Sequence, residues 1–298
     1  MSSIATRWLG YLAAFAIIGA TVFRVWLLPR IPGATTEQLR GINRRAVMAA
    51  RIAAVILALS TLLKLYLQAR SMIEPDEPVS AEIVRLVVGS LWGRGWLAQA
   101  TMALGALVGW RALAGADPPG WADRLIVLAA LGLALTMPLT GHAIGLPAAG
   151  RVGYPLTALH VGSGAVWLGT LGIIVIAVIR PADPSFELAP MIRAYSAIAL
   201  PAGLVTIGCG LIVGWRYVGG LNALFSTEYG NVLLGKLGAL AGIAATGAYN
   251  WRVVLPQLLA GHTTPLSRSA RVEIVLGMVL LAVTAVLVSL AAPSEHTP

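Results

Sequence analysis

The chain has 298 residues, of which 58% are hydrophobic and 11% are charged, and its mean hydropathy is +0.82. A soluble domain carries about 25% charged residues, so this composition excludes a water-soluble enzyme and a disordered chain. The single cysteine excludes an intrachain disulfide and any zinc or iron–sulfur site built from cysteines. The net charge of +9 indicates basic cytoplasmic loops rather than binding to nucleic acid.

Apolar residues come in eight blocks, each near the length of roughly 20 residues with which a helix crosses a bilayer core. Backbone polar groups in lipid must be paired within the segment, so each block is predicted to be a helix. The chain is therefore expected to form an all-α, polytopic membrane helix bundle embedded in the lipid bilayer. The eight expected spans are 8–28, 46–68, 92–114, 122–141, 152–179, 195–218, 231–255 and 270–291.

The distribution of arginine and lysine predicts the orientation of these spans. If the N-terminus is outside, the inner connections and their adjoining helix ends carry twelve basic residues, against six on the outer side. Basic residues accumulate on the cytoplasmic side of membrane proteins. The sequence therefore predicts that both termini lie outside.

Two histidines fall near the outer ends of neighbouring spans. His160 is expected about two turns below the outer end of the fifth span, and His142 lies just beyond the fourth, after Pro138. Polar groups inside a bilayer are costly, so they point to function. Two imidazoles at an apolar outer mouth suit a transition metal or a haem. The alternative is one buried, hydrogen-bonded histidine and one interfacial histidine.

Two sulfur side chains are expected near the depth of these histidines. Met137 precedes His142 near the outer end of the fourth span, and Cys209 lies about nine residues from the outer end of the sixth. Imidazole, thioether and thiolate form a soft ligand set that favours Cu(I). Methionine and cysteine also commonly fill apolar space, which is the alternative role for both.

Further polar or aromatic residues stand out within the later spans. Tyr229 and Lys236 share one face at the start of the seventh span. Lys236 pairs with Glu228, points at helix carbonyls or snorkels to the surface. Trp167 falls deep inside the fifth span, whereas the other tryptophans lie near span ends. Glu273 is interpreted as a helix-dipole or loop ion-pair residue at the start of the last span.

Several of these sequences together resemble one known family. They are Gly141-His142-Ala143, Leu159-His160 with the stretch 165–169, and Thr227-x-Tyr229-Gly230-x-x-Leu233-Leu234-x-Lys236. In this order and spacing they are similar to the core of the copper resistance protein D (CopD) family. The resemblance covers most of the chain and is densest from about residue 137 to residue 290. It implies that residues 1–298 form a single CopD-like transmembrane domain.

The resemblance implies an eight-helix protein of the bacterial inner membrane, with both termini periplasmic. It implies that the protein binds copper, as Cu(I) or Cu(II), at its periplasmic side and transports or relays it inward. A separate periplasmic copper-binding protein is the implied partner. The expected ligands are His142, His160, Met137 and Cys209. The groups expected to surround or gate them are Tyr229, Lys236, Trp167 and Glu228.

Two other functions stay open at this point. A b-type haem protein needs two facing histidines at matched depth, and His142 lies closer to the surface than His160. A structural subunit of a larger membrane assembly needs no chemistry of its own. An enzyme is not expected and no catalytic residue is assigned, because the spans hold no paired carboxylates and the chain has neither a Gly-x-Ser-x-Gly elbow nor a phosphate-binding loop.

Overall fold

The computed structural model describes residues 2–140, 150–181, 186–260 and 266–293. All regular secondary structure in these ranges is helical, which confirms the all-α prediction. The main helices are α1 Ser2–Val22, α2 Thr36–Arg70, α3 Ala81–Gly89, α4 Leu91–Ala112, α5 Gly120–Thr136, α6 Gly150–Gly164, α7 Thr170–Ile174, α8 Leu188–Val218, α9 Leu221–Ser226, α10 Glu228–Tyr249, α11 Leu255–Leu259 and α12 Leu266–Leu287. Short turns of other helical types join or extend them: η1 Phe23–Leu27, η2 Leu28–Arg30, η3 Met137–Thr140, η6 Ala165–Gly169, η7 Val175–Ile179 and η8 Asn250–Val254.

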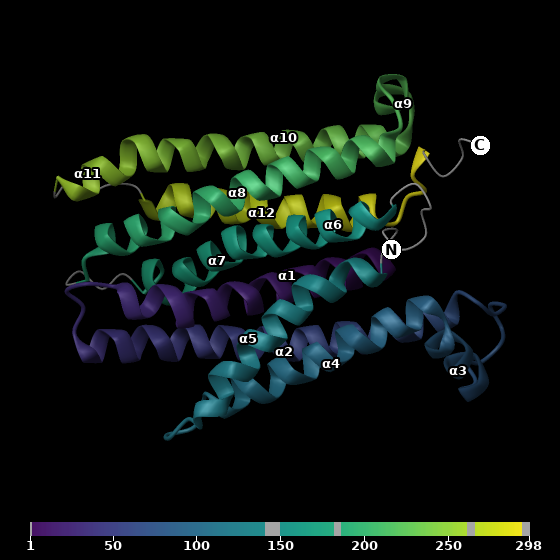
Figure 1. The fold of residues 1–298 in the computed structure, drawn as a ribbon, viewed down its shortest axis with the longest axis horizontal. Coiled ribbons are helices and arrows are strands. Elements are labelled where there is room, and N and C mark those ends of the chain that lie inside the picture. Colours follow the sequence, from purple (N-terminus) through teal and green to yellow (C-terminus); the bar gives the residue numbers. More distant parts are fainter. Residues whose placement is uncertain (1, 141–149, 182–185, 261–265, 294–298) are drawn as a thin grey trace.

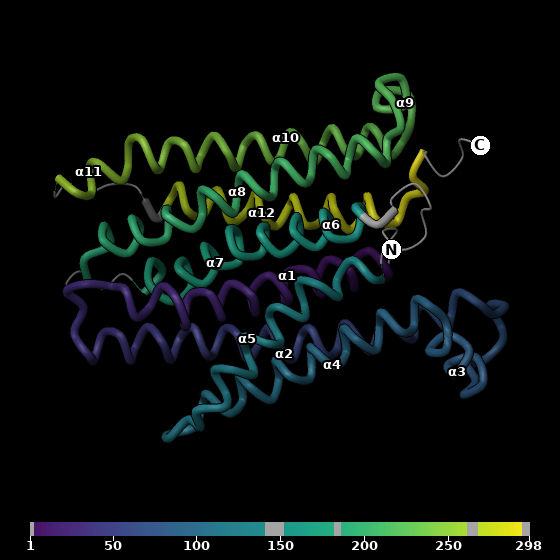
Figure 2. The backbone as a smooth tube through the Cα atoms, in the orientation of Figure 1, coloured from purple at the N-terminus to yellow at the C-terminus, as the bar shows by residue number. Residues whose placement is uncertain are grey.

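The long helices lie side by side in a bundle, and α4 and α5 form a pair tilted against the rest (Figure 1). The path of the backbone shows that the chain runs back and forth between the two ends of this bundle (Figure 2). The N- and C-terminal ends lie together at one end, which we call the terminal end (Figure 1). We call the opposite end the basic end, because exposed arginines such as Arg30, Arg40 and Arg44 lie there.

Seven helices in the described residues are long and apolar enough to cross a membrane: Ser3–Arg30, Thr36–Arg70, Gly120–Thr140, Val152–Ile179, Leu188–Val218, Glu228–Leu259 and Arg268–Leu287. They correspond to seven of the eight expected spans. The third expected span, 92–114, forms α4, which is not among the seven because its glycines, Gln99, Arg94 and Arg111 lower its hydropathy.

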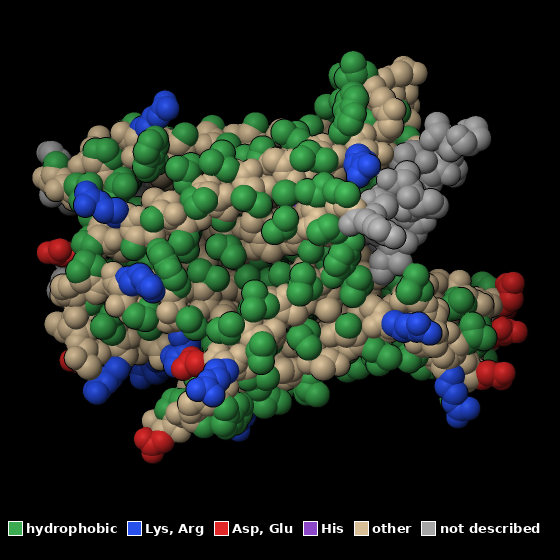
Figure 3. All heavy atoms as spheres, viewed as in Figure 1, with side chains coloured by type: hydrophobic (Ala, Val, Ile, Leu, Met, Phe, Trp, Pro, Cys, Tyr) green, Lys and Arg blue, Asp and Glu red, His purple; other side chains and the backbone are tan. Residues whose placement is uncertain are grey.

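The outer surface of the bundle suits a lipid environment. Hydrophobic side chains cover much of the visible face, and most charged side chains lie toward its two ends (Figure 3). Large apolar residues such as Leu59, Leu104, Leu128 and Leu204 are exposed on four different helices. The protein is therefore a multi-pass membrane protein, as the composition predicted.

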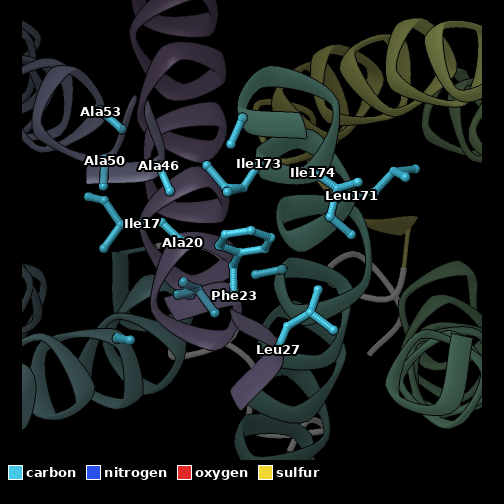
Figure 4. Packing of buried hydrophobic residues seen from close by; sticks show 14 of the residues in the cluster. Ile17, Ala20, Phe23, Leu27, Ala46, Ala50, Ala53, Leu171, Ile173 and Ile174 are labelled. Atoms are coloured by element: carbon cyan, nitrogen blue, oxygen red, sulfur yellow. The ribbon is translucent and has the colours of Figure 1, made fainter. Parts of the chain in front are cut away.

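The core centres on the crossing of α1 with the chain that carries η6 and α7. Phe23 and Leu27 are fully buried between these two elements (Figure 4). The backbones touch where two glycines meet: a Cβ atom on Gly19 would lie 2.0 Å from the carbonyl carbon of Gly169. This close approach fixes the position of η6, and Trp167 within η6 marks the boundary of the site described next.

Candidate copper site and inner cavity

A cavity of about 190 Å³ lies in the terminal half of the bundle, among α1, α6, α8, α10 and α12. We call it the outer cavity, after the orientation that the sequence predicts. Its lining includes five residues that the sequence analysis singled out, from four separate elements: Met137, His160, Trp167, Tyr229 and Lys236. Residues up to 99 positions apart in the sequence thus meet at one place.

One ring nitrogen of His160 forms a hydrogen bond to the backbone, and the other is available to bind a metal ion. Its Nδ1 lies 2.7 Å from the backbone carbonyl oxygen of Thr206 on α8. A carbonyl oxygen can only accept, so Nδ1 carries the hydrogen and donates it. The neutral ring then keeps a lone pair on Nε2, as a metal ligand requires.

The space for this ring comes from a glycine on α8. A Cβ atom on Gly210 would lie 2.7 Å from Cε1 and 2.8 Å from Nδ1 of His160, closer than carbon and nitrogen atoms can approach. A hydroxyl pair next to it holds the two helices together, since Ser163 Oγ and Thr206 Oγ1 are 2.8 Å apart. Thr206 and Gly210 are site residues that the sequence analysis did not identify.

Lys236 and Tyr229 line the cavity from α10, whose first turn is capped by Thr227 Oγ1 accepting from the Gly230 N–H at 3.0 Å. Within the described residues Lys236 has no hydrogen bond or ion pair, and it lies close enough to His160 to act on it electrostatically. The expected alternative of a Lys236–Glu228 ion pair is wrong. Glu228 is exposed at the helix start, about 12 Å along the axis from Lys236, and does not line the cavity.

The two sulfur candidates have different positions. Met137 in η3 is 7% exposed and lines the outer cavity. Cys209 is half-buried on α8 and does not line it. The cavity face of α8 passes through Thr206 and Gly210, and Cys209 lies beyond the edge of this face, about 60° around the helix from Thr206 and about 100° from Gly210. Cys209 is therefore not placed with the other expected ligands.

The remaining expected ligand, His142, lies in 141–149, outside the described residues. Among the residues that are described, no group of three or more His, Cys, Asp and Glu side chains is arranged to hold a metal ion. The described part of the outer cavity therefore offers one imidazole and one thioether.

A second cavity of about 370 Å³ lies toward the basic end, and we call it the inner cavity. Trp167 lines both cavities. Its ring packs against Gly203 of α8, where an added Cβ atom would lie 3.4 Å from Trp167 Cε3. Its backbone carbonyl oxygen accepts a hydrogen bond from Tyr195 Oη at 3.0 Å. Trp167 belongs to η6, a π-helical turn of the kind that is frequent at functional sites.

The inner cavity contains a buried carboxyl group. Glu273 is 5% exposed, and its Oε2 accepts a hydrogen bond from Asn250 Nδ2 at 3.2 Å. The interpretation of Glu273 as a surface helix-start residue is wrong. Helix α12 begins at Leu266, earlier than expected, so Glu273 lies two turns inside it.

Comparison with known proteins matches both halves of the chain. Residues 1–152 match the family model of the copper resistance protein D-like N-terminal domain, and residues 189–287 match that of copper resistance protein D. The chain belongs to the copper resistance protein D family. This confirms the resemblance inferred from the sequence. His160 and Trp167 lie between the two matched ranges of this CopD-family chain, whereas Lys236 and Glu273 lie within the second.

One curated protein is similar to part of the chain. The CopD-family chain is 31% identical over 180 residues to "Copper transport protein CutJ" of Bacillus subtilis (strain 168). The match covers 60% of this chain and 32% of the relative, so it spans about a third of the relative's length. No solved structure matches the chain significantly.

Proposed function

We propose that the protein binds copper from the periplasm in the outer cavity and moves it inward through the bundle. The observation that carries this proposal is the state of His160. The Thr206 carbonyl accepts from Nδ1–H, which leaves the lone pair of Nε2 for a metal ion in a cavity that Met137 also lines. Imidazole and thioether are ligands of copper rather than of the hard cations magnesium and calcium.

The charge in the cavity favours Cu(I) as the cargo. Lys236 lies near His160 and has no anionic partner in the described part of the chain. A bound cation is repelled by the ammonium group in proportion to its own charge, so Cu(II) is repelled twice as strongly as Cu(I) at the same distance. The thioether of Met137 also prefers the softer Cu(I) ion.

The proposed orientation has eight crossings and both termini in the periplasm of a bacterial inner-membrane protein. Both termini lie at the same end of the bundle, which requires an even number of crossings (Figure 1). Seven spans alone would separate the termini, so α4 serves as the eighth. Its apolar residues Leu97, Leu104 and Val108 are exposed, as expected for a helix in contact with lipid. A separate periplasmic copper-binding protein would deliver copper to the terminal end.

The size of the outer cavity argues against the haem alternative. Pockets that hold cofactor-sized ligands measure about 300–1,000 Å³. The outer cavity, as the described residues enclose it, measures about 190 Å³, which suits an ion with its ligands.

The test is a Cu(I) titration of the purified protein, with its absorption spectrum recorded in parallel. Wild type should bind Cu(I), His160→Ala should lose most of the binding, and His296→Ala, in the C-terminal tail, should bind as wild type does. A Soret band in the purified protein, or equal binding by wild type and His160→Ala, would overturn the proposal.

A further inference from the structure

The inner cavity holds a carboxyl group that the proposed copper site does not use. Glu273 and Asn250 come from neighbouring helical segments, α12 and η8, and both line the cavity. Glu273 is 5% exposed, and its Oε1 would lie 3.1 Å from a Cβ atom on Gly247, so α10 packs closely against it. The carboxyl group is therefore held in place by two sides of the cavity.

Glu273 has no cationic partner in the described residues. Arg252 lines the same cavity but forms no ion pair with it. The other described charged or titratable groups near this cavity are engaged elsewhere or exposed. Tyr195 donates to the Trp167 carbonyl, Arg24 pairs with Asp123 at 2.7 Å, and Arg45 donates to the Ala177 carbonyl. The exposed ones are Arg180, Arg193, Arg268 and Arg271. A carboxylate buried without a counter-ion is costly, so it carries a proton or binds a cation.

The hydrogen bonding of Asn250 distinguishes a protonated Glu273 from an ionised one that binds a cation. Its Nδ2 donates to Glu273 Oε2, while its Oδ1 is buried and has no hydrogen-bond donor among the described residues. An ionised carboxylate offers only acceptors, so it leaves Oδ1 unsatisfied. A protonated carboxyl group has an O–H that can donate to Oδ1 while Oε2 still accepts from Nδ2, which pairs acid and amide through two hydrogen bonds.

We propose that Glu273 and Asn250 form a proton-binding site in the inner cavity. The carboxyl O–H bond breaks when a cation enters this cavity, the proton leaves to water at the basic end, and the carboxylate balances the charge of the entering ion. One proton leaves for each Cu(I) that enters, so charge in the cavity is conserved. The carboxylate oxygens of Glu273 and the amide oxygen of Asn250 are hard ligands and bind the soft Cu(I) ion weakly. Weak binding suits a site from which Cu(I) is released. The transport role rests on the proposed function, whereas the proton site itself does not.

The proton site can be tested without copper, by infrared spectroscopy of the purified, copper-free protein. Wild type should show the carbonyl band of a protonated, hydrogen-bonded carboxyl group that shifts in D₂O. Glu273→Gln should lack this band, Asn250→Ala should shift it, and Glu228→Gln, an exposed carboxylate at the terminal end, should keep it unchanged. A wild-type spectrum without a protonated carboxyl band, or a band that persists in Glu273→Gln, would overturn the proposal.

The link to copper needs a second measurement, Cu(I) uptake with proton release in proteoliposomes. Glu273→Gln should bind Cu(I) as wild type does but lose uptake and proton release. His160→Ala should lose Cu(I) binding yet keep the infrared band. If wild type binds no Cu(I) while the band is present, the proposed copper function fails and the proton site stands. If Glu273→Gln takes up Cu(I) with unchanged proton release, the coupling is refuted.

Discussion

His160 Nδ1 lies 2.7 Å from the backbone carbonyl oxygen of Thr206 and donates a hydrogen bond to it. This bond joins α6 to α8 in the wall of the outer cavity and sets the tautomer of the imidazole. In many metal-binding histidines the ring nitrogen that does not bind the metal donates to a carbonyl or carboxylate oxygen in this way. That hydrogen bond orients the ring and raises the basicity of the metal-binding nitrogen. The proposed binding of copper by His160 Nε2 depends on this hydrogen bond, because it keeps the hydrogen on Nδ1.

Replacing Gly210 with alanine should weaken copper binding without altering the fold. The new Cβ atom would lie 2.7 Å from the His160 ring, so the ring must move and lose its bond to the Thr206 carbonyl. A lost hydrogen bond costs about 1 kcal/mol, or roughly a fivefold loss of Cu(I) affinity. The matched control is Gly208→Ala on the same helix, where nothing lies within 4 Å of the added Cβ atom. Equal Cu(I) affinities of the two variants in a competition titration would contradict this geometry.

Replacing Lys236 with leucine should strengthen the binding of cations in the outer cavity. Leucine keeps the position apolar, adds no metal ligand and removes the positive charge near His160. The gain in affinity should be larger for Cu(II) than for Cu(I), because the repulsion scales with the charge of the ion. The control is Lys64→Leu, since Lys64 lies outside the cavity and donates to Thr140 Oγ1. The affinities for both ions are measured by competition with chelators, and weaker binding by Lys236→Leu than by wild type would contradict the prediction.

Replacing Trp167 with alanine should join the two cavities. Trp167 lines both of them, and removing its indole opens the space between His160 and the inner cavity. Cu(I) binding should persist, whereas Cu(I) should leak through proteoliposomes faster and without proton release. Trp121→Ala serves as the control, because Trp121 is 50% exposed at the start of α5 and lines neither cavity. Unchanged leakage of Cu(I) through Trp167→Ala would show that Trp167 does not separate the two cavities.

The orientation of the bundle can be tested with reporter fusions. Fusions after residue 40 and after residue 260 should both read cytoplasmic, because both positions belong to inner connections rich in arginine. A fusion after residue 116, between α4 and α5, should also read cytoplasmic if α4 crosses the membrane. Periplasmic signals at both 116 and 260, with a cytoplasmic signal at 40, would remove α4 from the spans. Periplasmic signals at all three positions would reverse the orientation.

The helices and much of the outer cavity were predictable from the sequence because both depend on regular spacing. Blocks of apolar residues mark the spans, and the i, i+4, i+7 spacing puts Tyr229 and Lys236 on one face of α10. Cys209 was misplaced because depth along a helix says nothing about rotation around it. One residue of error turns a side chain by about 100°, which is enough to leave the cavity.

Other features of the site depend on information that a single sequence does not carry. The partner of His160 is a backbone carbonyl of Thr206, and any residue at position 206 has one. Glu273 was assigned to the surface because the start of α12 was placed four residues too late, and helix ends are the least certain part of such predictions. The isolated acid within an apolar span was the available signal, together with Asn250 at the end of the preceding span.

The most direct test of the account is X-ray absorption at the copper edge of the Cu(I)-loaded protein. His160 Nε2 should appear as an imidazole scatterer, together with the sulfur of Met137. In His160→Ala the imidazole scattering should fall or vanish, while in Cys209→Ser the spectrum should stay unchanged because Cys209 does not line the cavity. Imidazole scattering that is the same in wild type and His160→Ala, or a spectrum that changes only in Cys209→Ser, would contradict the assignment of the copper site to the outer cavity.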